Sequence, residues 1–125
     1  MSHLTDIDIE IRDIDALKDA CTELGLPVEK AGMARGYGEA LHRAECVIRL
    51  KGPYDIAVNR QADGRWTLSA DLWNGHVERE VGPKFGRLRQ FYGVHRTLRE
   101  AQRIGLKARR SVLQDGTVRL ALCRV

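Results

Sequence analysis

The sequence predicts an α+β fold, a two-layer sandwich in which a mainly antiparallel sheet of about six strands carries two helices on one face. Short segments alternate apolar and polar side chains, as strands with one buried face do. Two longer segments repeat apolar side chains with the period of a helix. Tight turns join most of the strands, which favours antiparallel pairing. We expect the order β-α-β-β-β-α-β-β within a single domain, residues 1–125.

The first two elements are a strand and a helix. Residues 6–12 alternate strictly and place three isoleucines on one face, so they predict a half-buried strand. Asp13 follows as an N-cap whose carboxylate can accept the free amides of a first helical turn. Residues 14–24 then show helical spacing, and Gly25 can adopt the left-handed conformation that ends a helix.

The middle of the chain predicts three strands in a meander. Residues 27–42 break every period, and we interpret them as a loop with room for a short strand. Alternation resumes in residues 44–50, 54–60 and 65–73. Residues 61–64, QADG, form a hairpin turn because the glycine suits a positive φ.

The last third predicts a long helix and a hairpin. After a second loop, Pro83 lies near the start of an amphipathic helix over residues 85–105, where its missing amide costs nothing. Gly105 ends this helix. Residues 106–113 and 117–124 then flank the turn QDG as two further strands.

Charge is divided unevenly along the chain, whose net charge is +4. Residues 1–82 hold 10 Lys and Arg against 15 Asp and Glu, whereas residues 83–125 hold 11 against 2. The long helix contains five arginines and one acid, Glu100. Four of these arginines form what we call the basic row: Arg89, Arg96, Arg99 and Arg103. Because only Glu100 can pair with them inside the helix, the row lacks local counterions.

The basic row permits three interpretations. It can be a solvated face that pairs with the acidic first part of the chain. It can dock an acidic protein surface or a second copy of this chain, helped by four further side chains: Arg35, Tyr37, Gln90 and Tyr92. It can also bind the phosphates of RNA or DNA, although few candidate stacking aromatics accompany it.

Catalysis has little support in the sequence. The three cysteines and four histidines are scattered, with no CxxC or HExxH, so we expect inert buried thiols, no metal site and no cofactor. An enzyme would have to use a site at the loop-facing edge of the sheet, built from Tyr37, Asp71, Gln90 and Tyr92. No apolar run is long enough to span a membrane, and the first ten residues lack the features of a signal peptide, so we expect a cytoplasmic protein.

Several short motifs occur in a recognisable order: RGYG, YDIAVNR, SADLW, FGRLRQFYG and DGTVRLAL. Together they resemble an uncharacterised family that includes a conserved hypothetical reading frame of cyanobacterial and red-algal plastid genomes. The resemblance runs from about residue 1 to residue 124. It implies no agreed activity, but it implies an accessory part in a multi-protein system, since family members are sometimes encoded near AAA-type ATPases and small ferredoxin-like proteins.

The resemblance also marks particular residues. Position by position they are Arg35, Gly36, Tyr37, Tyr54, Asp55, Ile56, Arg60, Ala70, Asp71, Trp73, Gln90, Tyr92, Asp115 and Gly116. The family usually has Gln-Arg-Tyr-Ala in the long helix, where this chain has Gln90-Phe91-Tyr92-Gly93. We therefore expect a small non-enzymatic adaptor that docks an acidic partner through the basic row, with nucleic-acid binding as the alternative.

Overall fold

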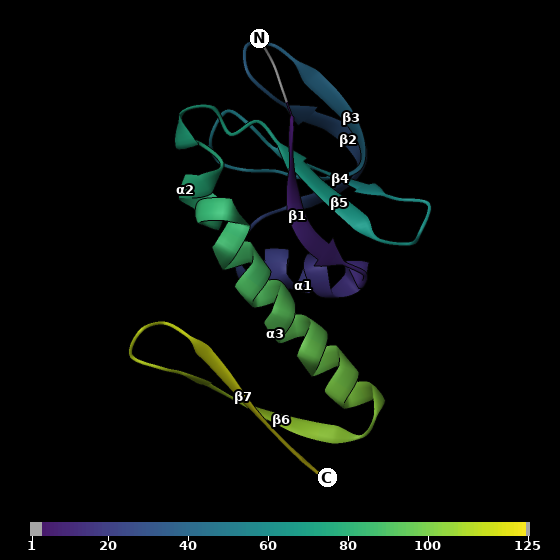
Figure 1. Ribbon diagram of the computed structural model, residues 1–125, viewed down its shortest axis with the longest axis vertical. Helices are drawn as coiled ribbons and strands as arrows, with labels where there is room; N and C mark the ends of the chain where they lie inside the picture. Colours follow the sequence, from purple (N-terminus) through teal and green to yellow (C-terminus); the bar gives the residue numbers. More distant parts are fainter. Residues whose placement is uncertain (1–3, 125) are drawn as a thin grey trace.

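The computed structural model describes residues 4–124, apart from the side chain of Asp8, and its main sheet has five antiparallel strands (Figure 1). Their spatial order is β1-β5-β4-β3-β2. The strands are β1 (Thr5–Ile11), β2 (Val28–Arg35), β3 (Leu41–Ile48), β4 (Ile56–Arg60) and β5 (Trp66–Ala70). The expected meander is confirmed, since β3, β4 and β5 are consecutive neighbours.

Strand β1 closes one edge of this sheet by pairing with β5, which lies far along the chain. Thr5 pairs with Ala70 and Ile7 with Leu68. The isoleucines of β1 face the core, as the alternation predicts: Ile11 is fully buried, and Ile7 and Ile9 pack against the same cluster.

Strand β2 corrects the expectation of a loop over residues 27–42. Seven of its eight residues pair with β3, from Val28 opposite Ile48 to Arg35 opposite Leu41, and Ala31 is the one left out of the register. Ala31 has a φ of 51°, in the left-handed region that ordinary side chains seldom adopt. This local irregularity interrupts the alternation of side chains, which is why a search for period two misses the strand.

Helices α1 (Ile14–Glu23) and α3 (Gly86–Arg103) cover one face of the sheet, so the expected arrangement is confirmed. Asp13 caps α1, because its Oδ1 accepts the amide of Ala16 at 3.0 Å. The core between the layers includes Leu17 of α1 and Leu88 of α3 together with apolar side chains of the sheet. The opposite face of the sheet buries only a small cluster, Ala34, Ala44, Val47 and Ala57.

The connection from β5 to α3 is more structured than the loop predicted for it. It contains two single turns, η1 (Trp73–Gly75) and η2 (Pro83–Phe85), and a short helix, α2 (Glu78–Val81). Gly82 precedes the proline with a φ of 84°, and a Cβ there would lie 2.9 Å from the amide nitrogen of Arg87. A side chain at this position would therefore block the tight entry into α3.

The last two strands, β6 (Leu106–Val112) and β7 (Val118–Arg124), pair only with each other. The sequence suggested that they would belong to one sheet with the others, whereas they form a separate hairpin against α3 (Figure 1). Its inner face is only partly covered: Leu106, Ala108, Val118 and Leu120 are half-buried, and Leu122 stays 47% exposed. The hairpin thus adds a third element to the two-layer arrangement.

Candidate interaction surfaces

The basic row does not act as one uncompensated set of charges. Arg99 reaches across to α1, where its Nε lies 2.5 Å from Oδ2 of Asp19 and its Nη2 lies 3.1 Å from Oδ1. The hydrogen bond from Arg99 lowers the pKa of the Asp19 carboxyl, as expected for a carboxylate held by a guanidinium. The premise that this arginine is free to attract a partner is therefore wrong.

The other three arginines of the row are exposed, as Arg99 is, but none of them pairs with a described residue of another element. Arg103 pairs with Glu100 one turn earlier, its Nε lying 3.0 Å from Oε2, in a solvent-facing contact of the kind that contributes little stability. Arg89 and Arg96 form no hydrogen bond or ion pair with any described residue. Since Arg89, Arg96 and Arg103 recur every seven residues, they lie along one stripe of α3, and we call them the exposed row.

Tyr92 belongs to the core, so it cannot supplement a docking surface as the sequence suggested. Its side chain is 5% exposed. The hydroxyl oxygen accepts the amides of Arg12 and Asp13 at 3.1 and 3.2 Å, where β1 passes into α1. Those two amides would otherwise lack a partner at the helix start. Tyr92 thus holds the first helix to the last one.

Gln90 also has a structural partner. Its Nε2 donates to the carbonyl oxygen of Gly116 in the turn of the β6–β7 hairpin, at 3.3 Å. Gly116 has a φ of 86°, and the carboxylate of Asp115 accepts the amide of Thr117. Three residues marked by the resemblance therefore meet where the hairpin turn rests on α3.

The hairpin carries a second basic surface that the sequence reasoning largely missed. Lys107, Arg109 and Arg119 alternate on its outer face with three small side chains: Ser111, Ala121 and Cys123. All three cations are exposed, and none forms an ion pair with a described residue. Among the described residues of this face of the hairpin there is no Asp or Glu side chain. The alternation within LKARRSV and VRLALCR was the signal that could have found it.

Cys123 on this face is exposed, so the expectation of three buried thiols holds only for Cys21 and Cys46. Burial raises the pKa of the Cys21 thiol to about 12.

The other face of the hairpin places a cation beside Phe91 of α3. Arg110 lies with its guanidinium carbon 5.6 Å from the centre of the Phe91 ring, within the range of a cation–π contact. The same guanidinium donates to both oxygens of Glu23 in α1, at 2.8 and 2.6 Å. Strand β6 therefore supplies a positive charge that lies beside α3 at Phe91 and is bound by α1 at Glu23.

Arg35 is engaged inside the chain, and this corrects its place in the docking surface. Its Nε and Nη2 bind the two oxygens of Asp55, each at 2.8 Å, and Arg49 contacts the same carboxylate at 2.8 Å. Asp55 is fully buried, which opposes its ionisation. The hydrogen bonds from Arg35, the Leu50 amide and Arg49 outweigh burial and lower the pKa of Asp55 to about 2.

Tyr37 lies at the end of the sheet beside an aromatic neighbour. Its ring and that of Trp73 meet edge to face with centroids 5.6 Å apart, and they are 41% and 58% exposed. Buried Asp71 holds both residues, because its carboxylate accepts the amide of Tyr37 at 2.9 Å and that of Trp73 at 3.0 Å. Asp71 thus fixes backbone geometry, the role usual for such an acid.

The four residues of the enzyme hypothesis are not assembled into one site. Tyr37 and Asp71 meet at the end of β5, whereas Gln90 contacts the hairpin turn and Tyr92 the β1–α1 junction. Across the part of the chain that the structure describes, no group of three His, Cys, Asp or Glu side chains gathers as metal ligands would. Within residues 4–124, no helix is long and apolar enough to cross a membrane.

The model of one protein family, described as a protein of unknown function (DUF1257), matches residues 20–121. The chain belongs to this family. The DUF1257 match agrees with a relative in the red alga Pyropia yezoensis, described as "Uncharacterized protein ycf35". The two are 30% identical over 128 residues, covering 99% of this chain and 98% of the relative.

Membership of the DUF1257 family confirms the resemblance drawn from the motifs, and it adds no activity. No solved structure matches the chain significantly.

Proposed function

We propose that this protein is a small non-enzymatic binding module that docks an acidic protein surface through the exposed row of α3 and the outer face of the β6–β7 hairpin. One observation carries the proposal: the outer face presents Lys107, Arg109 and Arg119 to solvent, and no Asp or Glu lies beside them on the described strands. Charges arranged in this way steer a partner of opposite sign and select against positively charged ones. The expected cytoplasmic location, and an accessory role beside an AAA-type ATPase, remain parts of this proposal.

The exposed row supports the same function from the neighbouring helix. Arg89 and Arg96 form no ion pair with a described residue, although Arg96 lies near enough to Glu10 and Glu100 to lower their pKa values. Arg103 has a solvent-exposed pair with Glu100. Arg99 and Arg110 have a structural role instead. The pair of Arg99 with Asp19 attaches α3 to α1, and the pair of Arg110 with Glu23 attaches the hairpin to α1. The internal pairs thus hold the surface in place, and the unpaired cations are left for a partner.

The test is capture from a lysate of the native cell, treated with nuclease, by the wild-type chain and two charge-reversal variants. One variant carries Arg89→Glu and Arg96→Glu, and the other carries Lys107→Glu, Arg109→Glu and Arg119→Glu. We expect each to reduce affinity for the captured protein, identified by mass spectrometry, at least roughly tenfold. The matched control, Arg43→Glu with Arg60→Glu, changes exposed arginines of the main sheet and should bind normally.

Capture that survives both reversals would refute the proposal, provided that the variants melt within a few degrees of the wild type. Recovery of the chain itself as the partner would identify self-association. Light scattering of the purified protein would then show a dimer that the hairpin variant loses.

A second candidate, binding of RNA or DNA, is favoured by the shape of the same hairpin. A two-stranded ribbon fits the major groove of B-DNA, and a row of unpaired cations can contact phosphates. The exposed aromatics that could stack on single-stranded bases, Tyr37 and Trp73, lie beside Asp71 at the end of β5. The main sheet and the β6–β7 hairpin lie on opposite sides of α3 (Figure 1). This separation is why an acidic protein is the preferred partner.

If the protein binds nucleic acid, its affinity should fall steeply as the salt concentration rises. If the three hairpin cations each neutralise one phosphate of duplex DNA, the logarithm of affinity should fall with the logarithm of salt concentration with a slope of about −3. Fluorescence anisotropy with labelled duplex DNA and single-stranded RNA measures this slope. No binding at low salt to either probe would eliminate this candidate.

A further inference from the structure

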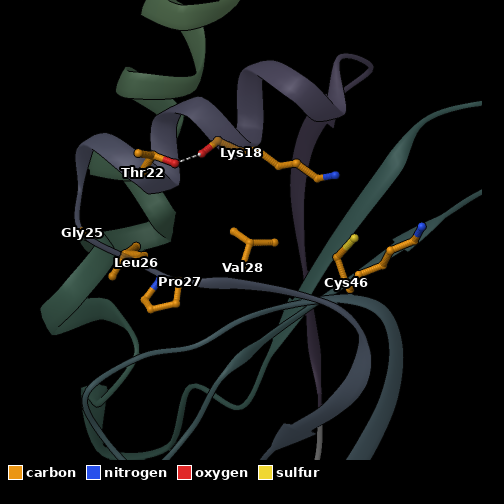
Figure 2. Close-up of a pocket in the computed structure, with 8 residues that line it drawn as sticks. Lys18, Thr22, Gly25, Leu26, Pro27, Val28 and Cys46 are labelled. Atoms are coloured by element: carbon orange, nitrogen blue, oxygen red, sulfur yellow. Dashed lines mark hydrogen bonds between the residues drawn. The ribbon is translucent and has the colours of Figure 1, made fainter.

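A hollow of about 480 Å³ opens between α1 and the edge of the sheet (Figure 2). Its lining shares no residue with either basic surface. Its size lies within the range of pockets that hold small organic ligands, roughly 300–1,000 Å³. Leu26, Pro27, Val28 and Cys46 line it with apolar surface, and Lys18 and Lys30 add two cations. Such a pocket suits a ligand that combines apolar surface with a negative charge.

The two lysines approach the hollow from opposite elements. Lys18 projects from α1, and Figure 2 shows its side chain extending toward the end where Cys46 lies. Lys30 is the direct cross-strand partner of Cys46, so the two side chains share one face of the sheet. Cys46 belongs to the core on the helix side. Lys30 is therefore on the face that is turned toward α1.

Neither ammonium group has a counterion within the described residues. Lys18 and Lys30 form no hydrogen bond or ion pair through their side chains. The acids next to them in the chain are engaged elsewhere: Asp19 binds Arg99, and Glu29 binds Arg49 at 2.7 Å. The fold thus directs nearby carboxylates to arginines and leaves two lysines at the pocket uncompensated.

The pocket is polarised from one end to the other. The cationic end lies beside Cys46, whereas Leu26 and Pro27 line the opposite end, near the last turn of α1 (Figure 2). The C-terminus of a helix carries partial negative charge and disfavours an anion. An anionic head group is therefore attracted to the lysines, and its apolar body is directed toward Leu26 and Pro27.

We propose that this hollow is a binding site for a small organic anion with an apolar body, such as a medium-chain carboxylate or alkyl phosphate. Lys18 and Lys30 hold the anionic group, and Val28, Leu26 and Pro27 contact the apolar body. The site is independent of the proposed docking surfaces. It can be occupied whether or not the hairpin binds a partner.

The probe for the test is the fluorescent anion 1-anilinonaphthalene-8-sulfonate, titrated into the folded full-length chain. We expect saturable binding that becomes roughly tenfold weaker in Lys18→Gln with Lys30→Gln, as the loss of two partly exposed charge contacts predicts. Both lysines are exposed, so these changes should preserve the fold. The matched control, Lys107→Gln with Arg109→Gln, removes two charges from the hairpin and should keep the wild-type affinity.

Competition identifies the head group and the body. Octanoate and octyl phosphate should both displace the probe, and their relative strength separates a carboxylate ligand from a phosphate one. Octanol and octyltrimethylammonium should displace it poorly, because they lack the anion. Amide shifts in an NMR titration should cluster at residues 18, 28, 30 and 46.

The proposal is overturned if the probe does not saturate, if the lysine variant binds as tightly as the control, or if the shifts cluster on the hairpin.

Discussion

Tyr92 illustrates how one atom can decide the role of a residue. From the sequence it was a surface aromatic beside a row of arginines, but its hydroxyl oxygen accepts two amides at the start of α1. Asp55 is the comparable case among the charged residues, since one buried carboxylate binds two arginines and the amides of Arg35 and Leu50. The contacts of both residues stabilise the folded structure.

Replacing Tyr92 with Phe should therefore cost stability without affecting partner capture. Loss of the hydroxyl leaves the amides of Arg12 and Asp13 without this acceptor, and we expect a loss of about 1–2 kcal/mol in the free energy of unfolding. Urea denaturation measures it. Tyr37→Phe, at an exposed ring, is the control and should change stability by less than about 0.5 kcal/mol. Equal stability of the two variants would contradict the structural role of Tyr92.

At the scale of elements, the β6–β7 hairpin depends on a few polar contacts and on limited apolar burial. Glu23 of α1 is the centre of these contacts, since it binds Arg110 of the hairpin and also lies 2.7 Å from Nε2 of His95 in α3. The hydrogen bond from Arg110 is the main cause that lowers the pKa of Glu23 to about 2. One side chain thus links three elements.

Replacing Glu23 with Gln should loosen the hairpin selectively. Without the carboxylate, Arg110 loses its ion pair, and amides of β6 and β7 should exchange with solvent roughly 5-fold faster, while those of the main sheet keep their rates. Hydrogen–deuterium exchange read by mass spectrometry resolves the two sets. Glu100→Gln removes an acid that interacts with Arg103 and Arg96 of its own helix, so it should leave the hairpin unchanged. Faster exchange throughout the chain would argue against a local effect.

At the scale of the whole molecule, the stability of the fold should depend on pH through Asp55. Its folded-state pKa of about 2 lies below the ordinary value of 3.8, so its contribution is present above pH 4 and is lost as the pH falls toward 2. The shift corresponds to about 2 kcal/mol. Glu23 is partly exposed and adds a smaller effect in the same direction.

Urea denaturation at pH 5, 4, 3 and 2.5 should therefore show stability falling mainly below pH 4. Asp55→Asn should be less stable than the wild type at pH 5, and its curve should be flatter below pH 4. If that variant does not fold, an NMR titration of the wild-type Asp55 carboxyl gives the same information. A carboxyl titrating near 3.8 would contradict the network described for Asp55.

Local patterns in the sequence were enough to predict most of the elements of this protein. The period of the side chains located β1, the β3–β5 meander, both main helices and the final hairpin, and Asp13 and Gly25 marked the ends of α1, because caps and periods depend on near neighbours. Strand β2 escaped because Ala31 breaks its alternation. The excess of positive charge in the last third of the chain was likewise evident from the sequence.

Only the tertiary structure decided which of those charges remain free. Arg99 finds Asp19 across 80 positions of sequence, and Arg110 finds Glu23 across 87. Pairing at this distance depends on how helices and strands pack, and no local pattern encodes it. The same packing buried Tyr92, set the hairpin apart from the main sheet, and left Lys18 and Lys30 beside an apolar hollow. The sequence determined how much positive charge there is, and the fold determined where it can act.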